Sequence, residues 1–206
     1  MGIPVLILGE SGSGKSASLR NMPPDETILI NAVGKPLPFR GKFPFTVNTN
    51  NYSKIKTAIK KSTEKFKRCV IDDSQYLLAF DYLSRAKETG YGKFTDLALS
   101  FVDLIEYVTN NTPPDYIVYF LHHVEFTEDG RIKAKTIGKM LDEKIGIEGL
   151  CTIVLLCKTD GKRHYFVTQS DGRTTAKSPM EMFDSEIDND LNMVDETIRK
   201  YYEFKS

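Results

Sequence analysis

The chain has 206 residues, a length that suits one α/β domain with elaborations better than two independent cores. Hydrophobic residues make up 40% of it, which is enough for an ordinary globular core. The 28 Lys and Arg residues balance 28 Asp and Glu residues, so bulk charge predicts no nucleic-acid binding and any such site must be a local patch.

The sequence indicates a cytoplasmic protein. No apolar run is long enough to span a bilayer, and the first residues lack the basic region, apolar core and cleavage site of a signal peptide. Cys69, Cys151 and Cys157 each lie in an apolar stretch, without metal-ligand spacing to a histidine. We therefore expect buried, reduced thiols in a soluble protein that does not bind membranes.

Strands and helices alternate in the first two thirds of the chain. Strands are predicted at Ile3–Leu8, Thr27–Ile30, Phe45–Thr49, Arg68–Ile71 and Tyr116–Leu121. Helices are predicted at Lys15–Asn21, Tyr52–Lys65, Gln75–Lys87 and Asp96–Thr109. This alternation predicts an α/β fold with a mostly parallel central sheet flanked by helices.

The last third is richer in strand signals. Arg131–Ile137 alternates in polarity like an exposed strand, and Cys151–Leu156 and His164–Thr168 flank a turn signal at Asp160-Gly161. These segments predict a C-terminal β-hairpin extension at about residues 131–170. We assign residues 1–183 to one P-loop domain.

Residues 184–206 are assigned to an acidic tail. No Lys or Arg occurs between Lys177 and Arg199, while acidic residues are frequent there. We expect a solvated tail with a short helix near its end, because such charge runs are commonly solvated. The alternative is an acidic strip that competes with DNA for a basic surface.

The segment Gly9–Ser16 matches the phosphate-loop pattern G-x-x-x-x-G-K-[ST] in full, between a predicted strand and a predicted helix. Glycines let the backbone wrap closely around phosphate, and the following helix adds partial positive charge. Lys15 is expected to reach the β- and γ-phosphates of ATP, and the Ser16 hydroxyl to bind Mg²⁺. The predicted nucleotide-binding residues are Gly9, Glu10, Ser11, Gly12, Ser13, Gly14, Lys15, Ser16 and Ala17.

A phosphate loop needs an acidic partner at the end of a neighbouring buried strand. The strand that ends at Ile71 is followed by Asp72 and Asp73. Asp72 is expected to hold Mg²⁺, directly or through water, and Asp73 to orient or deprotonate the attacking water. The alternative is that both aspartates cap the helix that begins near Ser74.

Two adjacent histidines end the strand Tyr116–Leu121. His122 or His123 could present a polar group to the γ-phosphate, and only one should face the site because neighbouring strand residues point to opposite faces. Alternatively, one is a core residue and the other a surface residue. Glu125 is a second candidate for water activation.

Together, Gly9–Ser16, Asp72-Asp73 and the His122-His123 strand resemble the RecA-like ATPases, and more specifically small phage-encoded AAA/RecA-type nucleotide-binding proteins. The stretches Lys135–Leu141 and Thr175–Pro179 are similar to that group too. The resemblance covers roughly residues 1–183. It implies a RecA-like P-loop fold and ATP-dependent action on single-stranded DNA in phage recombination or replication. Some members of the group act as single-strand annealing ATPases.

The resemblance also implies a homo-oligomer with ATP sites between subunits, in the host cytoplasm, with phage single-strand-binding or replication proteins as possible partners. Lys177 and Arg173 are the candidates for a residue that reaches a neighbour's γ-phosphate, and ordinary surface charge is the alternative. One departure concerns Asn31, which occupies the place where RecA-type ATPases commonly carry a glutamate. Hydrolysis is therefore expected to be slow or DNA-stimulated.

Two segments could bind DNA. Residues 34–43 mix cations with aromatics, which can bind phosphate and stack on unpaired bases. Arg131, Lys133 and Lys135 alternate along a predicted strand and could share one face. A tight proline-rich loop and a lysine-protected edge strand are the structural alternatives.

Three other functions are alternatives to an ATPase that acts on DNA. Cys157–Asp160 faintly resembles the guanine-selecting N-K-x-D motif of GTPases, but its Asn is absent and a hairpin turn explains Asp160-Gly161 better. A small-molecule kinase would need an arginine-bearing lid that the sequence lacks. A non-catalytic switch module, in which nucleotide only sets the conformation, is favoured by the missing glutamate.

Overall fold

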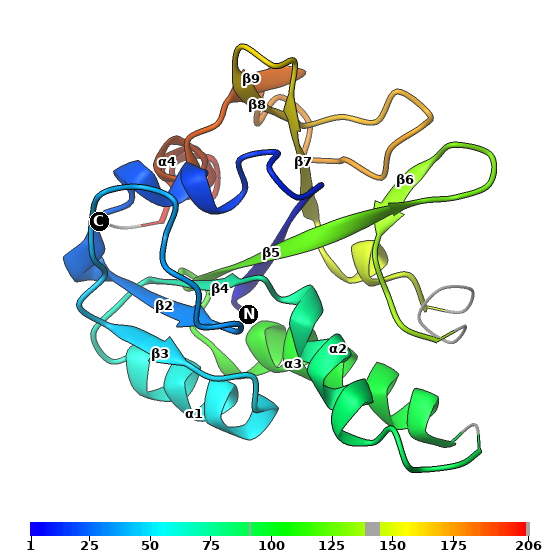
Figure 1. Cartoon of the computed structure of the whole chain (residues 1–206). Coiled ribbons are helices and arrows are strands. Elements are labelled where there is room, and N and C mark those ends of the chain that lie inside the picture. Colours follow the sequence, from blue (N-terminus) through cyan, green and yellow to red (C-terminus); the bar gives the residue numbers. More distant parts are fainter. Residues whose placement is uncertain (91, 139–144, 205–206) are drawn as a thin grey trace.

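The computed structural model describes residues 1–90, 92–138 and 145–204 and has a mostly parallel central sheet (Figure 1). The strand order is β3-β2-β4-β5-β1-β7-β8-β9, and β6 pairs with β5. The strands are β1 (Ile3–Gly9), β2 (Thr27–Asn31), β3 (Thr46–Asn48), β4 (Arg68–Asp72), β5 (Ile117–Phe126), β6 (Ile132–Ala134), β7 (Ile153–Thr159), β8 (His164–Val167) and β9 (Glu186–Asp188). The predicted α/β class and parallel sheet are confirmed.

The register brings the ends of three central strands together. β1 runs parallel to both β5 and β7, with Gly9 opposite His123 and Cys157. β4 runs parallel to β2 and β5, with Asn31 opposite Asp72. Because β1, β4 and β5 run parallel, the residues that follow β1 and β4 lie near His123, which is within β5, at the edge where ligands bind in open α/β sheets.

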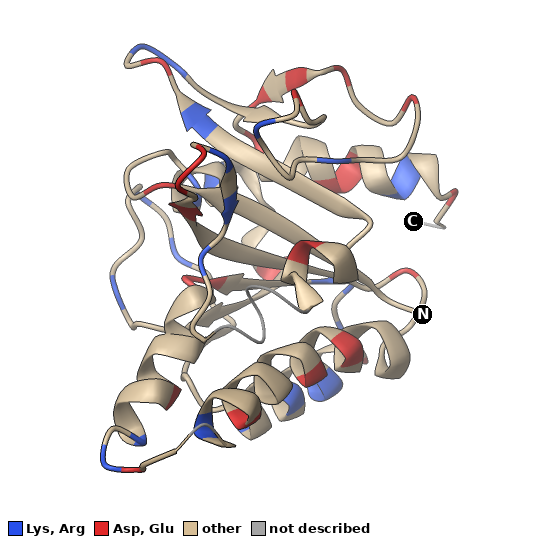
Figure 2. Cartoon of the chain, turned by 90° about the vertical axis from the view of Figure 1, so that its right-hand side faces the viewer, with Lys and Arg blue, Asp and Glu red and all other residues tan. Residues whose placement is uncertain are grey.

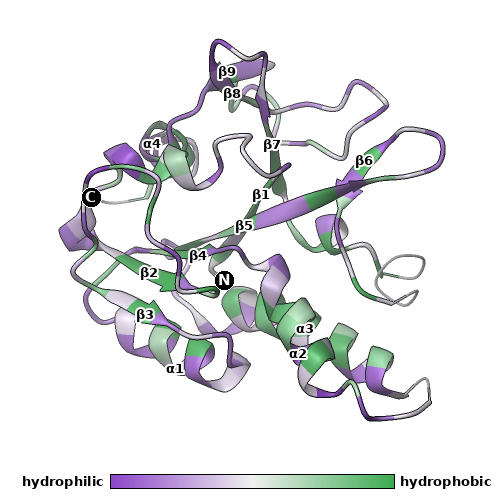
Figure 3. Cartoon of the chain, in the orientation of Figure 1, coloured by the Kyte–Doolittle hydropathy of each residue, from purple (hydrophilic) through white to green (hydrophobic). Residues whose placement is uncertain are grey.

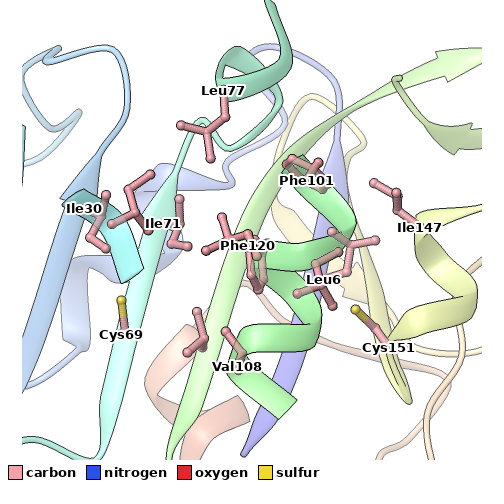
Figure 4. Packing of buried hydrophobic residues seen from close by; sticks show 14 of the residues in the cluster. Leu6, Ile30, Cys69, Ile71, Leu77, Phe101, Val108, Phe120, Ile147 and Cys151 are labelled. Atoms are coloured by element: carbon pink, nitrogen blue, oxygen red, sulfur yellow. The ribbon is translucent and has the colours of Figure 1, made fainter. Parts of the chain in front are cut away.

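Both faces of the sheet are covered, so its strands read as continuous apolar runs. Leu6 and Leu8 of β1 point to one face, packed by α1 (Tyr52–Ser62) and α3 (Gly92–Asn111), and Figure 4 shows part of this core around Phe101 and Phe120. Val5 and Ile7 point to the other face, packed by the 3-10 helix η1 (Ser16–Asn21) and α4 (Leu191–Tyr201). Figure 3 shows this apolar centre and the hydrophilic outer half of β5.

The helices follow the prediction with some changes at their ends. Asn51 caps α1 by accepting a hydrogen bond from the Lys54 amide. The other helical segments are α2 (Gln75–Ser84), η2 (Pro24–Glu26) and η4 (Ile147–Leu150). No helix in the described ranges combines the length and the apolar character needed to cross a bilayer.

The helix predicted at Lys15–Asn21 is present as η1, a 3-10 helix of 6 residues. Pro23 and Pro24 follow it, and proline cannot continue a helical hydrogen-bond ladder. A helix this short adds little dipole, so phosphate binding here would depend on loop amides and on Lys15. The positive charge that we expected from a helix dipole at this loop is therefore small.

The expectation of a solvated C-terminal tail is wrong. β9 pairs antiparallel with β8, and α4 buries Leu191, Val194 and Ile198 against the sheet. The fully buried Asp195 carboxylate accepts a 2.8 Å hydrogen bond from the Tyr119 hydroxyl. Apart from Asp195, most acidic residues of this segment are exposed, while its apolar residues complete the core.

The same carboxylate binds two arginines. Arg199 lies one helical turn further along α4, with 2.7 Å between its Nε and Asp195 Oδ2. A terminal nitrogen of Arg68, at the start of β4, lies 3.1 Å from the same oxygen. Breaking a buried ion pair of this kind costs several kcal/mol because the remaining charge stays buried. This network therefore fixes α4 onto the strands.

Candidate nucleotide-binding site

The loop between β1 and η1 needs glycine at two positions. Gly12 and Gly14 have φ angles of 81° and 105°, where side chains with a Cβ are strained. A Cβ on Gly14 would also lie 2.9 Å from Nδ1 of His164, which sits over the loop. The loop conformation therefore depends on the sequence pattern and on a residue from β8.

Lys15 lies along this loop and is 6% exposed. Its ammonium group donates 2.8 Å hydrogen bonds to the carbonyls of Gly9 and Glu10. Burial lowers the pKa of Lys15, while the acidic groups near it, including Asp73 and Asp72, act in the opposite direction. A lysine ammonium has three donors, so one remains to bind an anion.

Ser16 and Asp72 meet although they come from different elements. The Ser16 hydroxyl donates a 2.8 Å hydrogen bond to Oδ1 of Asp72, at the end of β4. Burial raises the pKa of the Asp72 carboxyl, and the bond from Ser16 offsets this only in part. A hydroxyl beside a carboxylate is the type of oxygen pair that binds Mg²⁺. The two predicted metal ligands are therefore adjacent.

Asp73 adopts a φ of 59°, an uncommon conformation for a residue with a side chain. Its carboxylate lies 2.5 Å from Nζ of Lys35 and 3.3 Å from Nε2 of His123. Burial raises the pKa of Asp73, but the bonds from His123 and Lys35 outweigh it and lower the pKa to about 2. An acid this strong is a weak base, which favours a role in orienting water over deprotonating it.

The capping alternative for the aspartates is not seen. Ser74 occupies the N-cap position of α2, and no side-chain hydrogen bond caps that end. The Asp72 carboxylate accepts the bond from Ser16, and the Asp73 carboxylate contacts Lys35 and His123. Both aspartates thus point toward the phosphate loop.

A cavity of about 340 Å³ opens beside the loop. It is lined by Ser11, Gly12, Gly14, Lys15, Ser16, Ala17, Lys35, Pro38, Asp73, His123 and His164. Gly9, Glu10 and Ser13, which we also predicted to bind nucleotide, do not line it. The Gly9 and Glu10 carbonyls hold Lys15 instead, and Ser13 is buried. The cavity is thus cationic at Lys15 and Lys35 and borders the Ser16–Asp72 pair.

Of the two histidines that end the predicted strand, His123 lines the cavity and His122 does not. Nδ1 of His122 accepts a 2.9 Å hydrogen bond from Ser74, and Nε2 donates a 2.8 Å bond to the Lys135 carbonyl. Burial lowers the pKa of His122 to about 3, so it is neutral. This corrects the expectation for His122, since strand alternation turns it into the core.

Three other candidate residues lie away from the cavity. Glu125, on the outer part of β5, forms a 3.2 Å ion pair with Lys133. The Lys177 backbone bridges to Val154 of β7, and the Arg173 carbonyl accepts from the Ile132 amide. Glu125 therefore does not face the loop of its own chain, and the proposed role of Lys177 or Arg173 in a neighbouring subunit stays a prediction.

The Asn31 side chain, at the end of β2, has a structural role. Its side-chain oxygen accepts a 2.7 Å hydrogen bond from the Gly34 amide, and its nitrogen donates a 2.7 Å bond to the Lys35 carbonyl. Asparagine side chains commonly close turns in this way. Asn31 therefore positions the backbone from which Lys35 reaches Asp73.

Residues from the C-terminal third brace the phosphate loop. Nδ1 of His164 lies 2.7 Å from the Ser13 carbonyl, and the Cys157 thiol donates to the same oxygen at 3.1 Å. Asn189, after β9, donates a 3.3 Å hydrogen bond to the Gly14 carbonyl. Sequence patterns did not reveal His164, Asn189 or Lys35 as site residues. The predicted buried state of all three cysteines is confirmed.

The predicted DNA-binding segments are largely engaged in internal contacts. Phe43 is buried and Phe39 packs on the same core, so these rings are not free to stack on bases. Arg131 pairs with Asp129, and Lys133 with Glu125. On the side of the molecule in Figure 2, basic and acidic segments are interspersed. Arg40 and Lys42 of the first segment are exposed.

Two further features of the structure differ from the loop cavity in their chemistry. Asp160 accepts hydrogen bonds of 2.9 Å from the Lys162 and Arg163 amides, so it closes the β7–β8 turn as predicted and does not form a guanine-binding motif. A larger apolar groove of about 480 Å³ lies between β3 and α1, near Phe45 and Phe66. It lacks the glycine-rich backbone and the carboxylates of the loop cavity. The loop cavity is therefore the better candidate for binding a phosphate group.

No protein-family model matches the sequence, and no curated protein matches it. Residues 139–141 of the family-like stretch Lys135–Leu141 lie outside the described residues. The other stretch, Thr175–Pro179, follows the bridge to β6 and carries the Lys177 bridge to β7. The case for a function therefore depends on the geometry of the site.

Proposed function

We propose that this protein binds Mg-ATP at the loop Gly9–Ser16 and hydrolyses it slowly. The contact between Ser16 and Asp72 carries the proposal, because it joins the end of the loop to the acid that ends β4. Lys15 would neutralise the β- and γ-phosphates, and Ser16 and Asp72 would hold Mg²⁺. When bound, Mg²⁺ supplies positive charge that stabilises the negative charge developing on the phosphates.

The strand order supports a RecA-like ATPase. β5 lies between β1, which leads into the phosphate loop, and β4, which ends at Asp72. This insertion is the arrangement expected for P-loop ATPases that carry an additional strand between these two. In the outer half of β5, His123 borders the cavity and would contact the γ-phosphate.

We further propose that the protein acts on single-stranded DNA during phage recombination or replication, in the host cytoplasm. The resemblance of the motifs supports this, as do the exposed cations Arg40 and Lys42 on the loop that also carries Lys35. The protein would assemble as a homo-oligomer, in which Lys177 or Arg173 could approach a neighbour's ATP. Other phage replication proteins would be its partners.

Phosphate release from ATP, measured with and without single-stranded DNA, tests this function. We expect slow release that DNA stimulates and that Lys15→Ala abolishes. The exposed α1 residue Lys60 provides the control variant Lys60→Ala, which should behave as wild type. Release that responds to a small-molecule acceptor and not to DNA would indicate a kinase and contradict the proposal.

A nucleotide-dependent switch is the second candidate, because one observation favours it. The Asp73 carboxylate is occupied by Lys35 and His123 and is a weak base, and Asn31 provides no carboxylate in its place. Tight Mg-ATP binding with no phosphate release, with or without DNA, would support the switch over the ATPase.

A further inference from the structure

Lys35 reaches the phosphate cavity from outside the phosphate loop. It lies four residues after β2, on a segment whose turn Asn31 closes through Gly34 and the Lys35 carbonyl. Further along the same segment, Leu37 and Phe39 pack on the core. The backbone on both sides of Lys35 is thus anchored, while the side chain itself lines the cavity.

The ion pair between Lys35 and Asp73 can exchange, because the Lys35 side chain is largely in solvent. The Lys35 side chain is 58% exposed, whereas the Asp73 side chain is 7% exposed. An ion pair with one solvated member is worth little to stability, so exchanging the partner of Lys35 costs little. Asp73 also retains its contact with His123 if Lys35 leaves.

We propose that Lys35 is a γ-phosphate ligand supplied by the same chain, which Asp73 holds at the cavity until a nucleoside triphosphate binds. This inference rests on the proposed nucleotide site and adds a residue that discriminates triphosphate from diphosphate. It requires no neighbouring subunit, in contrast to the roles considered for Lys177 and Arg173.

The charges at the cavity support this exchange. A γ-phosphate carries more negative charge than a carboxylate and offers several oxygens, so it competes well for an ammonium group. Bound diphosphate lacks that group, so Lys35 would stay on Asp73.

Calorimetric titration of the full chain with magnesium and either a non-hydrolysable ATP analogue or ADP tests the inference. For Lys35→Ala we expect triphosphate affinity to fall at least about tenfold and ADP affinity to change less than about twofold. Lys35→Arg keeps the charge and should retain most of the discrimination. The matched control is Lys60→Ala, an exposed lysine of α1 that does not line the cavity.

An unchanged ratio of triphosphate to diphosphate affinity in Lys35→Ala would overturn the inference, whether both affinities fall together or neither falls. The wild-type titration separates this result from failure of the proposed function. If wild type binds neither nucleotide, the site itself is wrong and Lys35 has no phosphate to bind. If wild type binds both and Lys15→Ala binds neither, only the role of Lys35 remains in question, and the ratio decides it.

Discussion

The Ser16 hydroxyl donates a 2.8 Å hydrogen bond to Asp72, a residue 56 positions further along the chain. Replacing Asp72 with Asn keeps an acceptor for Ser16 but removes the charge that would attract Mg²⁺. We expect Asp72→Asn to reduce the gain in ATP affinity that Mg²⁺ provides by about tenfold or more. Titrations with ATP, with magnesium and with a chelator, measure this gain.

The control for this variant is Asp188→Asn, which removes a charge from an exposed position on β9. Its magnesium-dependent gain should equal that of wild type. The metal assignment is contradicted if Asp72→Asn keeps the full gain.

Gly14 provides a test of the loop conformation. Gly14→Ala forces a Cβ into a backbone with φ of 105° and to within 2.9 Å of His164 Nδ1. We expect Mg-ATP affinity to fall by at least about tenfold because the loop must move. Gly172→Ala is the matched control, since its φ is 86° and its Cβ would meet nothing within 4 Å. Equal binding by both variants and wild type would show that the loop geometry does not matter.

Asp195 is predicted to be essential to stability. Asp195→Ala leaves Arg68 and Arg199 at the core without their carboxylate, and we expect unfolding free energy to fall by about 3 to 5 kcal/mol. Urea denaturation measures the change. The neighbouring exposed Glu196 gives the control Glu196→Ala, with a loss within about 0.5 kcal/mol. Equal losses in the two variants would mean that the network contributes nothing.

His122 is predicted to make stability fall in mild acid. Its pKa is about 3 in the folded protein, and an unfolded histidine has a pKa of about 6.5. Between these values the unfolded chain binds a proton that the native state does not, so stability is lost as pH falls below about 6.5.

The loss from His122 amounts to at most about 1.4 kcal/mol per pH unit. His122→Gln keeps a nitrogen donor for the Lys135 carbonyl and cannot titrate, so its stability should vary less with pH than that of wild type. Urea denaturation at pH 7.5 and 5.5 gives both slopes. Parallel slopes would show that His122 is not the source.

Local patterns were sufficient to predict the centre of the site. The phosphate loop is a contiguous motif, and Asp72 ends a buried strand, so both were identified and now lie in contact. The same reasoning found the parallel sheet from alternating strands and helices. It did not show whether His122 or His123 faces the cavity. Which β5 side chains point to each face of the sheet depends on the pairing of β5 with β1 and β4.

The remaining site residues depend on tertiary contacts. Lys35 stood in a proline-rich loop, and His164 and Asn189 follow the loop by more than a hundred residues. The integration of the C-terminal segment did have a local signal. Asp190 caps α4 and Leu191, Val194 and Ile198 follow at helical spacing, but the acidic composition outweighed this pattern in the prediction.

The most direct test of the account is calorimetric titration of wild type and Lys15→Ala with Mg-ATP. We expect one nucleotide bound per chain in wild type, and an affinity lower by about a hundredfold or more in Lys15→Ala, because Lys15 supplies the buried ammonium at the loop. Full Mg-ATP affinity in folded Lys15→Ala, or no binding by wild type, would contradict it.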